Sequence, residues 1–234
     1  MTCAGSDGNT RGMNPIPSKF TVRRGLLVAL CLASFSLPAR AAPSGRLFAP
    51  EKATAQAPKV FKARFTTTKG DFTVEVHRDW APLGADRFYN LIKIGYFDDV
   101  AFFRAIDNFM VQFGINGSGE VNGKWQTAHI DDDPAAGQTN ARGMVTFATS
   151  GPNSRTTQLF INYKDNGNLD PMGFRPFGKV IQGMEVVDSL YKGYGEGAPR
   201  GRGPRQDLLQ SQGNDYLKKE FPLLDYVKRA KVVK

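Results

Sequence analysis

The chain has 234 residues, of which 41% are hydrophobic and 23% charged, so it can bury one core and wholesale disorder is excluded. The formal net charge is +9, but residues 1–41 hold five basic residues against one acidic residue, and the rest is too weakly basic to indicate a nucleic-acid partner. Both cysteines lie within the first 31 residues, which excludes a disulfide framework or a cysteine nucleophile after residue 31. The chain has only two histidines, which argues against a multi-histidine metal site.

Residues 19–41 have the pattern of a secretory signal peptide. A basic stretch at 19–24 precedes an apolar run at 25–37 that is too short to cross a bilayer comfortably, and the segment ends on Ala-Arg-Ala. We predict cleavage after Ala41 and therefore a periplasmic or secreted protein. The main alternative is an uncleaved segment that anchors the chain in a membrane.

The same region leaves smaller alternatives open. The stretch before Lys19 is long for a signal peptide, so Met13 is an alternative start. Arg23-Arg24 and Cys31 suggest twin-arginine export and lipid attachment, but the residues around them fit both patterns poorly.

The chain after residue 41 divides into a spacer and one domain. Residues 42–59 are rich in Ala and Pro and have no apolar periodicity, which predicts a flexible linker before a domain at 60–234. Apolar and polar residues alternate at 61–65 and 72–76, which predicts a β-hairpin. Strand-like runs follow at 100–105, 109–114, 143–148, 158–163 and 175–182, with a final strand at 225–233, so that we expect eight strands. Helical spacing predicts helices at 81–95, 183–191 and 214–220. Because hairpins outnumber crossovers, we expect a mainly β fold in which an antiparallel sheet closes into a barrel.

Three conspicuous motifs do not predict chemistry. Asp131–Asp133 lacks the spaced ligands of a calcium loop, and a solvated loop is the better interpretation. The glycines at 193–197 lack the strand and helix that flank a phosphate-binding loop. The run Arg200–Arg205 could contact RNA or acidic lipid, but an exposed, mobile loop is favoured.

The segment Phe102–Gly114 is more informative. On a strand, Phe102 and Arg104 would share one face, and Met110 and Gln112 would share a face further along. An arginine among aromatic residues is costly to bury unless it is hydrogen-bonded. Taken alone, the pattern also fits a partly exposed arginine whose stem packs on aromatic rings.

Several motifs of the chain resemble those of the cyclophilins, in the family's order. Phe102-Phe103-Arg104 with Phe109-Met110 and Gln112 is similar to the first cyclophilin motif, and 143–162 is similar to the second. Leu169-Asp170 and 177–184 follow, so that the likeness covers residues 62–190. The resemblance implies an eight-stranded antiparallel barrel capped by two helices, here with a C-terminal extension at 192–234. It also implies cis–trans isomerisation of X–Pro bonds without a cofactor or metal.

The resemblance assigns roles to individual residues. It implies that Arg104, Phe109 and Gln112 are catalytic, with the Arg104 guanidinium opposing the resonance of the prolyl amide. Gln112 would bind a substrate carbonyl, and Thr149 would act through its backbone. The implied substrate-binding residues are Met110, Ala148, Thr149, Gln158, Phe160, Leu169 and Phe174.

The sequence also departs from the cyclophilin pattern. Phe103 stands where many members have His, and Phe174 stands roughly where others have a pocket His. Asn168 replaces the Trp of cyclosporin-sensitive members, so we expect weaker cyclosporin binding with activity retained. Residues 192–224 are longer than a minimal cyclophilin needs, and the sequence assigns them no function.

These observations predict a bacterial, exported peptidyl-prolyl isomerase. The expected partners are proline-containing peptides and unfolded exported proteins, and no nucleic acid. We expect membrane contact only if the N-terminal segment is uncleaved, and we expect the chain to be a monomer. Two alternatives are a non-enzymatic peptide-binding module or chaperone on the same barrel, and a membrane-tethered scaffold.

Overall fold

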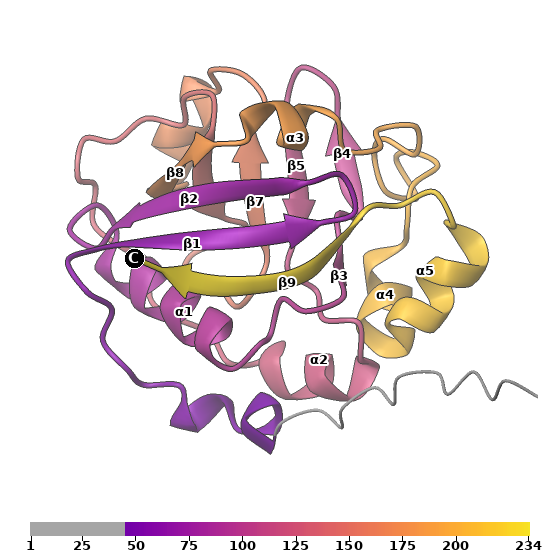
Figure 1. Ribbon diagram of the computed structural model, residues 1–234, viewed down its shortest axis with the longest axis horizontal. Helices are drawn as coiled ribbons and strands as arrows, with labels where there is room; N and C mark the ends of the chain where they lie inside the picture. The colour runs from indigo at the N-terminus through magenta and orange to yellow at the C-terminus, as the bar shows by residue number, and fades with distance from the viewer. Residues whose placement is uncertain (1–44) are drawn as a thin grey trace, which may run out of the picture. The chain divides into compact units, whose positions relative to one another are not determined.

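The computed structural model describes residues 45–234, which belong to one compact unit (Figure 1). The predicted signal peptide, residues 1–41, lies outside the described residues. Within residues 45–234, no helix is long and apolar enough to cross a membrane.

Nine strands form one sheet with antiparallel pairing throughout, which confirms the predicted mainly β fold. Their order is β3-β9-β1-β2-β8-β6-β7-β5-β4, and the sheet curls around the core (Figure 1). The strands are β1 Val60–Thr67, β2 Asp71–His77, β3 Val100–Ala101, β4 Arg104–Ile106, β5 Met110–Phe113, β6 Met144–Phe147, β7 Leu159–Asn162, β8 Pro176–Gln182 and β9 Tyr226–Val233.

The sheet has nine strands rather than eight because the predicted strand at 100–105 is broken. Its first part, β3, pairs with β9, whereas its second part, β4, pairs with β5 at the other end of the sheet. The hydrogen-bonded ladder is therefore not the closed ring that we expected, and Phe102-Phe103 joins its two ends through the chain itself. The bend also separates two residues predicted to share a face: Phe102 packs in the main core, 5.1 Å from the Phe113 ring, whereas Arg104 lies opposite Gln112.

The main core is rich in aromatic residues and lies inside the curled sheet. Alternation along β1 buries Phe61, Ala63 and Phe65, and these side chains meet those of the partner strand β2. The rings of Phe65 and Phe72 stack with centroids 4.9 Å apart. This packing confirms the predicted first hairpin.

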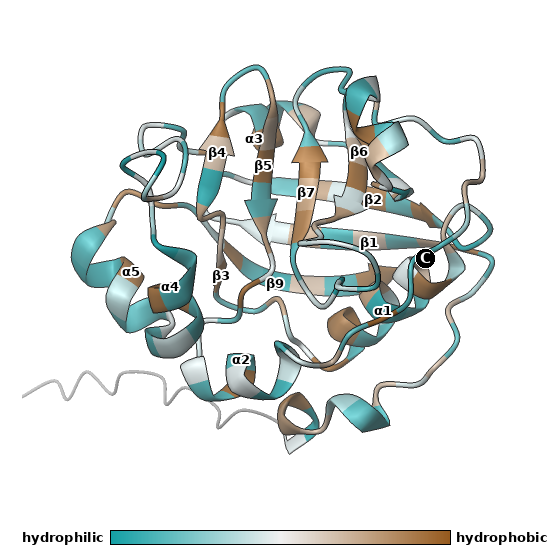
Figure 2. Ribbon diagram, turned by 180° about the vertical axis from the view of Figure 1, so that it is seen from behind, coloured by the Kyte–Doolittle hydropathy of each residue, from teal (hydrophilic) through white to brown (hydrophobic). Residues whose placement is uncertain are grey.

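Five α-helices flank the sheet. They are α1 Pro82–Lys93, α2 Gly119–Trp125, α3 Met184–Asp188, α4 Gln206–Gln212 and α5 Asn214–Glu220. Helices α1 and α3 lie on opposite sides of the β1–β2 hairpin (Figures 1 and 2). The helices α1, α3 and α5 fall within predicted helical segments, but α2 and α4 lie where we expected loops. Each spans only seven residues, too few for helical periodicity to be recognised in the sequence.

A buried carboxylate holds the start of α1. Asp133 accepts hydrogen bonds from the amides of Leu83 (2.7 Å) and Gly84 (2.9 Å) and pairs with Arg155 Nη1 at 2.8 Å. Its side chain is fully buried. The expectation of a solvated loop at Asp131–Asp133 is therefore wrong for Asp133, which caps a helix.

Residues 45–59 also differ from the expected flexible linker. Two short 3₁₀ turns, Gly45–Phe48 and Pro50–Lys52, lie here, and Leu47 is buried. The Trp125 indole donates to the Leu47 carbonyl at 2.8 Å, and the Ala57 amide donates to an Asp86 carboxylate oxygen at 2.8 Å. Such side chain–backbone bonds have no periodic signature, which is why the sequence alone did not predict them.

The predicted extension is an insertion, residues 192–224, between α3 and β9. The final strand β9 lies between β3 and β1 in the sheet, so the last residues are part of the barrel. The insertion carries α4 and α5, which lie beside β3 (Figures 1 and 2). A second hydrophobic cluster attaches it to the barrel; its buried members are Ala101, Phe103, Ile115, Leu209, Leu217 and Leu224.

This cluster accounts for the burial of Phe103. Its side chain is only 1% exposed and packs among residues of the insertion, whereas the next residue, Arg104, borders the pocket described below. Close approach is also needed between the helices of the insertion and the barrel. Gly213 has φ +62°, and a side chain there would collide with the Gly117 carbonyl oxygen.

Candidate active site

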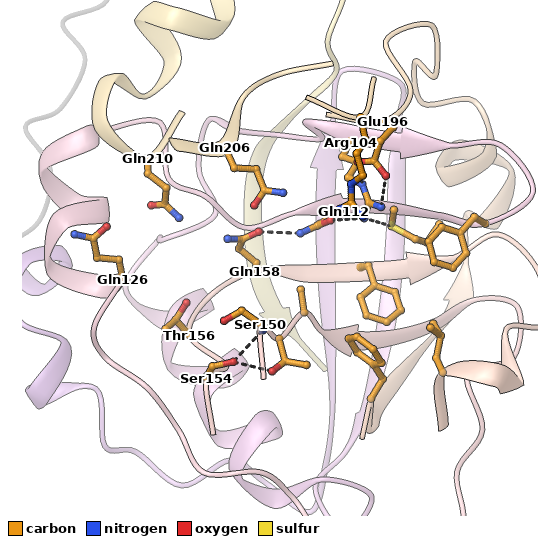
Figure 3. Close-up of a pocket in the computed structure, with 18 of the residues that line it drawn as sticks. Arg104, Gln112, Gln126, Ser150, Ser154, Thr156, Gln158, Glu196, Gln206 and Gln210 are labelled. Atoms are coloured by element: carbon orange, nitrogen blue, oxygen red, sulfur yellow. Dashed lines mark hydrogen bonds and ion pairs between the residues drawn. The ribbon is translucent and has the colours of Figure 1, made fainter. Parts of the chain in front are cut away.

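The β4–β5 hairpin places a row of polar side chains on the outer face of the sheet. The turn at 107–109 pairs Arg104 with Gln112 in register. Arg104 Nη1 donates to Gln112 Oε1 at 2.9 Å, and Gln112 Nε2 donates to Gln158 Oε1 at 2.8 Å (Figure 3). Gln112 thus has one amide orientation that satisfies both neighbours, and it fixes one side of the guanidinium.

This row borders a pocket of about 500 Å³. All ten residues that the resemblance predicted for the site line it, although they come from strands and loops far apart in the sequence. These residues are Arg104, Phe109, Met110, Gln112, Ala148, Thr149, Gln158, Phe160, Leu169 and Phe174. The structure shows that they come together; their individual roles stay predictions.

One end of the pocket is apolar. Met110, Phe160 and Leu169 are buried together, and Phe109 and Phe174 pack against them. The rings of Phe160 and Phe174 meet edge to face at 5.6 Å. A pocket of this composition can hold a small apolar ring and exclude water around it.

The loop that carries Leu169 is held by a carboxylate. Leu169 lies in a 3₁₀ turn, Gly167–Met172, and Asp170 of the same turn accepts bonds from the Asn140 amide (2.9 Å) and side chain (2.8 Å) and from Thr139. Partial burial alone would raise the pKa of Asp170, but the hydrogen bonds from Thr139 and Asn140 outweigh it and lower the pKa below its usual value.

The other end of the pocket is polar. Here the Ala148 amide donates to the Gln158 carbonyl at 2.9 Å, and the Thr149 hydroxyl bonds within its own turn, to Gly151. Sequence reasoning missed three glutamines that lie at this end: Gln126, which directly follows α2, and Gln206 and Gln210 from α4 (Figure 3). No motif marks them, because the fold alone brings these short helices to the pocket.

Sequence reasoning also missed the acidic partner of Arg104. Glu196, from the insertion, forms a bidentate pair: Arg104 Nε lies 2.7 Å from Oε1 and Nη2 lies 2.7 Å from Oε2 (Figure 3). The hydrogen bonds from Arg104 lower the pKa of Glu196 against the opposing effect of partial burial. The two residues are 92 positions apart, and Glu196 lies in a stretch where we recognised no motif, so the sequence carried no signal for this pair.

Within residues 45–234, no group of three or more His, Cys, Asp or Glu side chains could hold a metal ion. The pocket brings together a guanidinium held by hydrogen bonds, side-chain amides and hydroxyls, and an apolar recess. Such a set can bind an extended peptide and stabilise a change of charge at one atom, without forming a covalent bond.

Comparison with known proteins defines the class. The family described as "Cyclophilin type peptidyl-prolyl cis-trans isomerase/CLD" matches residues 62–207, more than half of the chain. A peptidyl-prolyl cis-trans isomerase of Acinetobacter baylyi is 37% identical over 131 residues, which cover 53% of this chain and 68% of that protein. The human peptidyl-prolyl cis-trans isomerase-like 3 is 37% identical over 128 residues, covering 54% and 79%.

The solved structures agree on the fold. The crystal structure of a Cryptosporidium parvum cyclophilin type peptidyl-prolyl cis-trans isomerase superposes with a TM-score of 0.56 at 21% identity, and the match covers 75% of this chain and 98% of that one. The chain described here belongs to the cyclophilin-type peptidyl-prolyl cis-trans isomerases. It is a peptidyl-prolyl cis-trans isomerase.

Proposed function

We propose that the protein binds extended peptides across this pocket, holds the proline ring in the apolar end, and lowers the rotation barrier through Arg104. The observation that carries this proposal is the placement of Arg104: a guanidinium fixed by hydrogen bonds at the mouth of a recess formed by Met110, Phe160 and Leu169. A further support is that the Cryptosporidium parvum isomerase was also crystallised with the dipeptide Ala-Pro.

The chemistry follows from the amide bond. Rotation about X–Pro meets a barrier of about 18–20 kcal/mol because the nitrogen lone pair is delocalised into the carbonyl. In the twisted transition state that lone pair is localised on the prolyl nitrogen. A fixed cationic donor next to that atom binds the twisted form more strongly than the planar one, which lowers the barrier. Gln112 would bind a substrate carbonyl and keep Arg104 oriented.

The test is prolyl exchange on an Ala-Ala-Pro-Phe peptide, with residues 42–234 and the Arg104→Ala variant measured side by side. The proposal expects the wild type to accelerate exchange and the variant to lose most of that acceleration. Equal acceleration by both proteins would contradict the role of Arg104. Peptide binding by folded wild type without acceleration would indicate a binding module instead.

We also propose that the protein is an exported bacterial enzyme whose substrates are unfolded exported proteins. The support is the basic and apolar pattern at 19–41, which ends on Ala-Arg-Ala. Expression of the whole chain in a bacterium, followed by fractionation and mass measurement, tests this. Export predicts a periplasmic or secreted product that begins at Ala42, whereas a membrane-bound product of full mass would favour the anchored alternative.

A further inference from the structure

The insertion at 192–224 contributes one charged side chain that forms an ion pair with Arg104. Its residue Glu196 binds the Nε and Nη2 atoms, whereas Gln112 binds Nη1 from the opposite side. We propose that Glu196 is a positioning residue: its carboxylate fixes the guanidinium plane of Arg104 in the orientation used in catalysis. This inference rests on the proposed function and extends it to a residue for which the sequence motifs predicted no role.

The first argument is the geometry of the pair. A carboxylate that accepts two parallel bonds from a guanidinium fixes the plane of that group, which a single bond to Gln112 Oε1 cannot do. The pair is also shielded, with the Arg104 side chain 18% exposed and the Glu196 side chain 28% exposed. Competition from water is therefore weaker than for a surface ion pair.

The second argument is that the loop around Glu196 is built to hold its carboxylate. Glu196 Oε1 accepts from the Gly197 amide at 2.9 Å, and the Glu196 carbonyl accepts from the Gly203 amide at 2.8 Å. A side chain at Gly201 would collide with the Glu196 carbonyl oxygen. The arginines of the run Arg200–Arg205 are exposed, as expected, while Gly201 and Gly203 of the same run pack against the Glu196 backbone.

The third argument is that the pair with Glu196 leaves part of the Arg104 guanidinium available to a substrate. Nη2 carries a second N–H besides the one that Glu196 binds, and the other contact of Nη1 is a weak one, with the Met110 sulfur at 3.9 Å. The residue still borders the pocket together with Glu196. A substrate can therefore meet the guanidinium while the Glu196 pair stays in place. A residue that only blocked the site would have to leave before each turnover.

Positioning predicts which kinetic constant changes. In the prolyl exchange assay, Glu196→Gln should lower kcat by about tenfold or more, with KM changed less, because misplacing a catalytic group by about 1 Å can cost up to about a hundredfold. Glu196→Asp keeps the charge and one or both bonds, so it should recover part of the loss.

Two more variants separate positioning from charge and from folding. Gly201→Ala should displace the Glu196 backbone and lower kcat in the same way, although it changes no charge. The matched control is Asp207→Asn, which breaks a comparable Arg205–Asp207 pair in the same insertion, exposed and outside the pocket, and should leave kcat unchanged.

The wild type in the same assay separates the two proposals. An inactive wild type would contradict the proposed function. If the wild type is active and the kcat of Glu196→Gln is equal or higher, only the positioning role is contradicted. A faster Glu196→Gln variant would show that the carboxylate competes with the substrate. A loss of kcat equal in Asp207→Asn and Glu196→Gln would show general disturbance of the insertion instead.

Discussion

The guanidinium of Arg104 is held by groups from distant parts of the chain. The neighbouring side chain, Phe103, packs against the insertion that supplies one of these groups. Gln112 reaches it across the β4–β5 hairpin, and Glu196 reaches it from the insertion. Phe103 points the other way, into the hydrophobic cluster beneath α4 and α5. At this scale, Phe103 is a packing residue that attaches the insertion to the sheet.

Phe103→Ala should therefore destabilise the protein by about 3–5 kcal/mol, because it removes a fully packed ring and leaves a cavity. Urea unfolding measures this. The matched control is Leu223→Ala in the same insertion, where the side chain is 59% exposed and the expected change is within about 0.5 kcal/mol. Similar small effects from both substitutions would show that the cluster does not stabilise the insertion.

At the scale of elements, the 3₁₀ turn Gly167–Met172 forms a wall of the apolar recess and depends on one acid. Asp170 ties this turn to Thr139 and Asn140, and its pKa is lowered. An acid with a lowered folded-state pKa stabilises the fold above its ordinary pKa, and it loses that contribution as pH falls through the lowered value. The wall should therefore loosen on acidification.

The expected result is that Asp170→Asn unfolds at lower urea than the wild type at pH 7, and that its KM for proline peptides rises. The difference in unfolding free energy, about 1–3 kcal/mol at neutral pH, should shrink when both proteins are measured near pH 3. A difference that stays constant over this pH range would mean that the ionised form of Asp170 is not what holds the turn.

The elements that the sequence predicted are those with strong periodicity. The β1–β2 hairpin, α1 and the strands from β5 to β9 followed from alternation or helical spacing. The ten site residues followed from family motifs, since their convergence is a tertiary property. The break at Phe102-Phe103, the helices α2 and α4, and the Glu196 pair depend on contacts between distant segments, so local sequence patterns could not reveal them.

At the scale of the whole molecule, residues 45–59 and the insertion at 192–224 pack onto the sheet and its helices and form part of one fold. Residues 45–59 bond to α1 and α2, and the insertion closes one side of the pocket. A chain that starts at residue 60 should therefore be less stable than one that starts at 42, by about 2–4 kcal/mol, from the lost burial of Leu47 and several hydrogen bonds. Thermal and urea unfolding check this, and equal midpoints for the two chains would show that the segment is a dispensable linker.

The central claim is that a fixed guanidinium at Arg104 lowers the barrier to prolyl rotation. The most direct measurement is the rate of prolyl exchange in an Ala-Ala-Pro-Phe peptide with wild type, Arg104→Ala and Arg104→Lys, each checked for folding. We expect acceleration by the wild type and a loss of at least about tenfold in both variants, because lysine keeps the charge but not the planar fork held by Glu196 and Gln112. Full acceleration by folded Arg104→Ala would contradict the account.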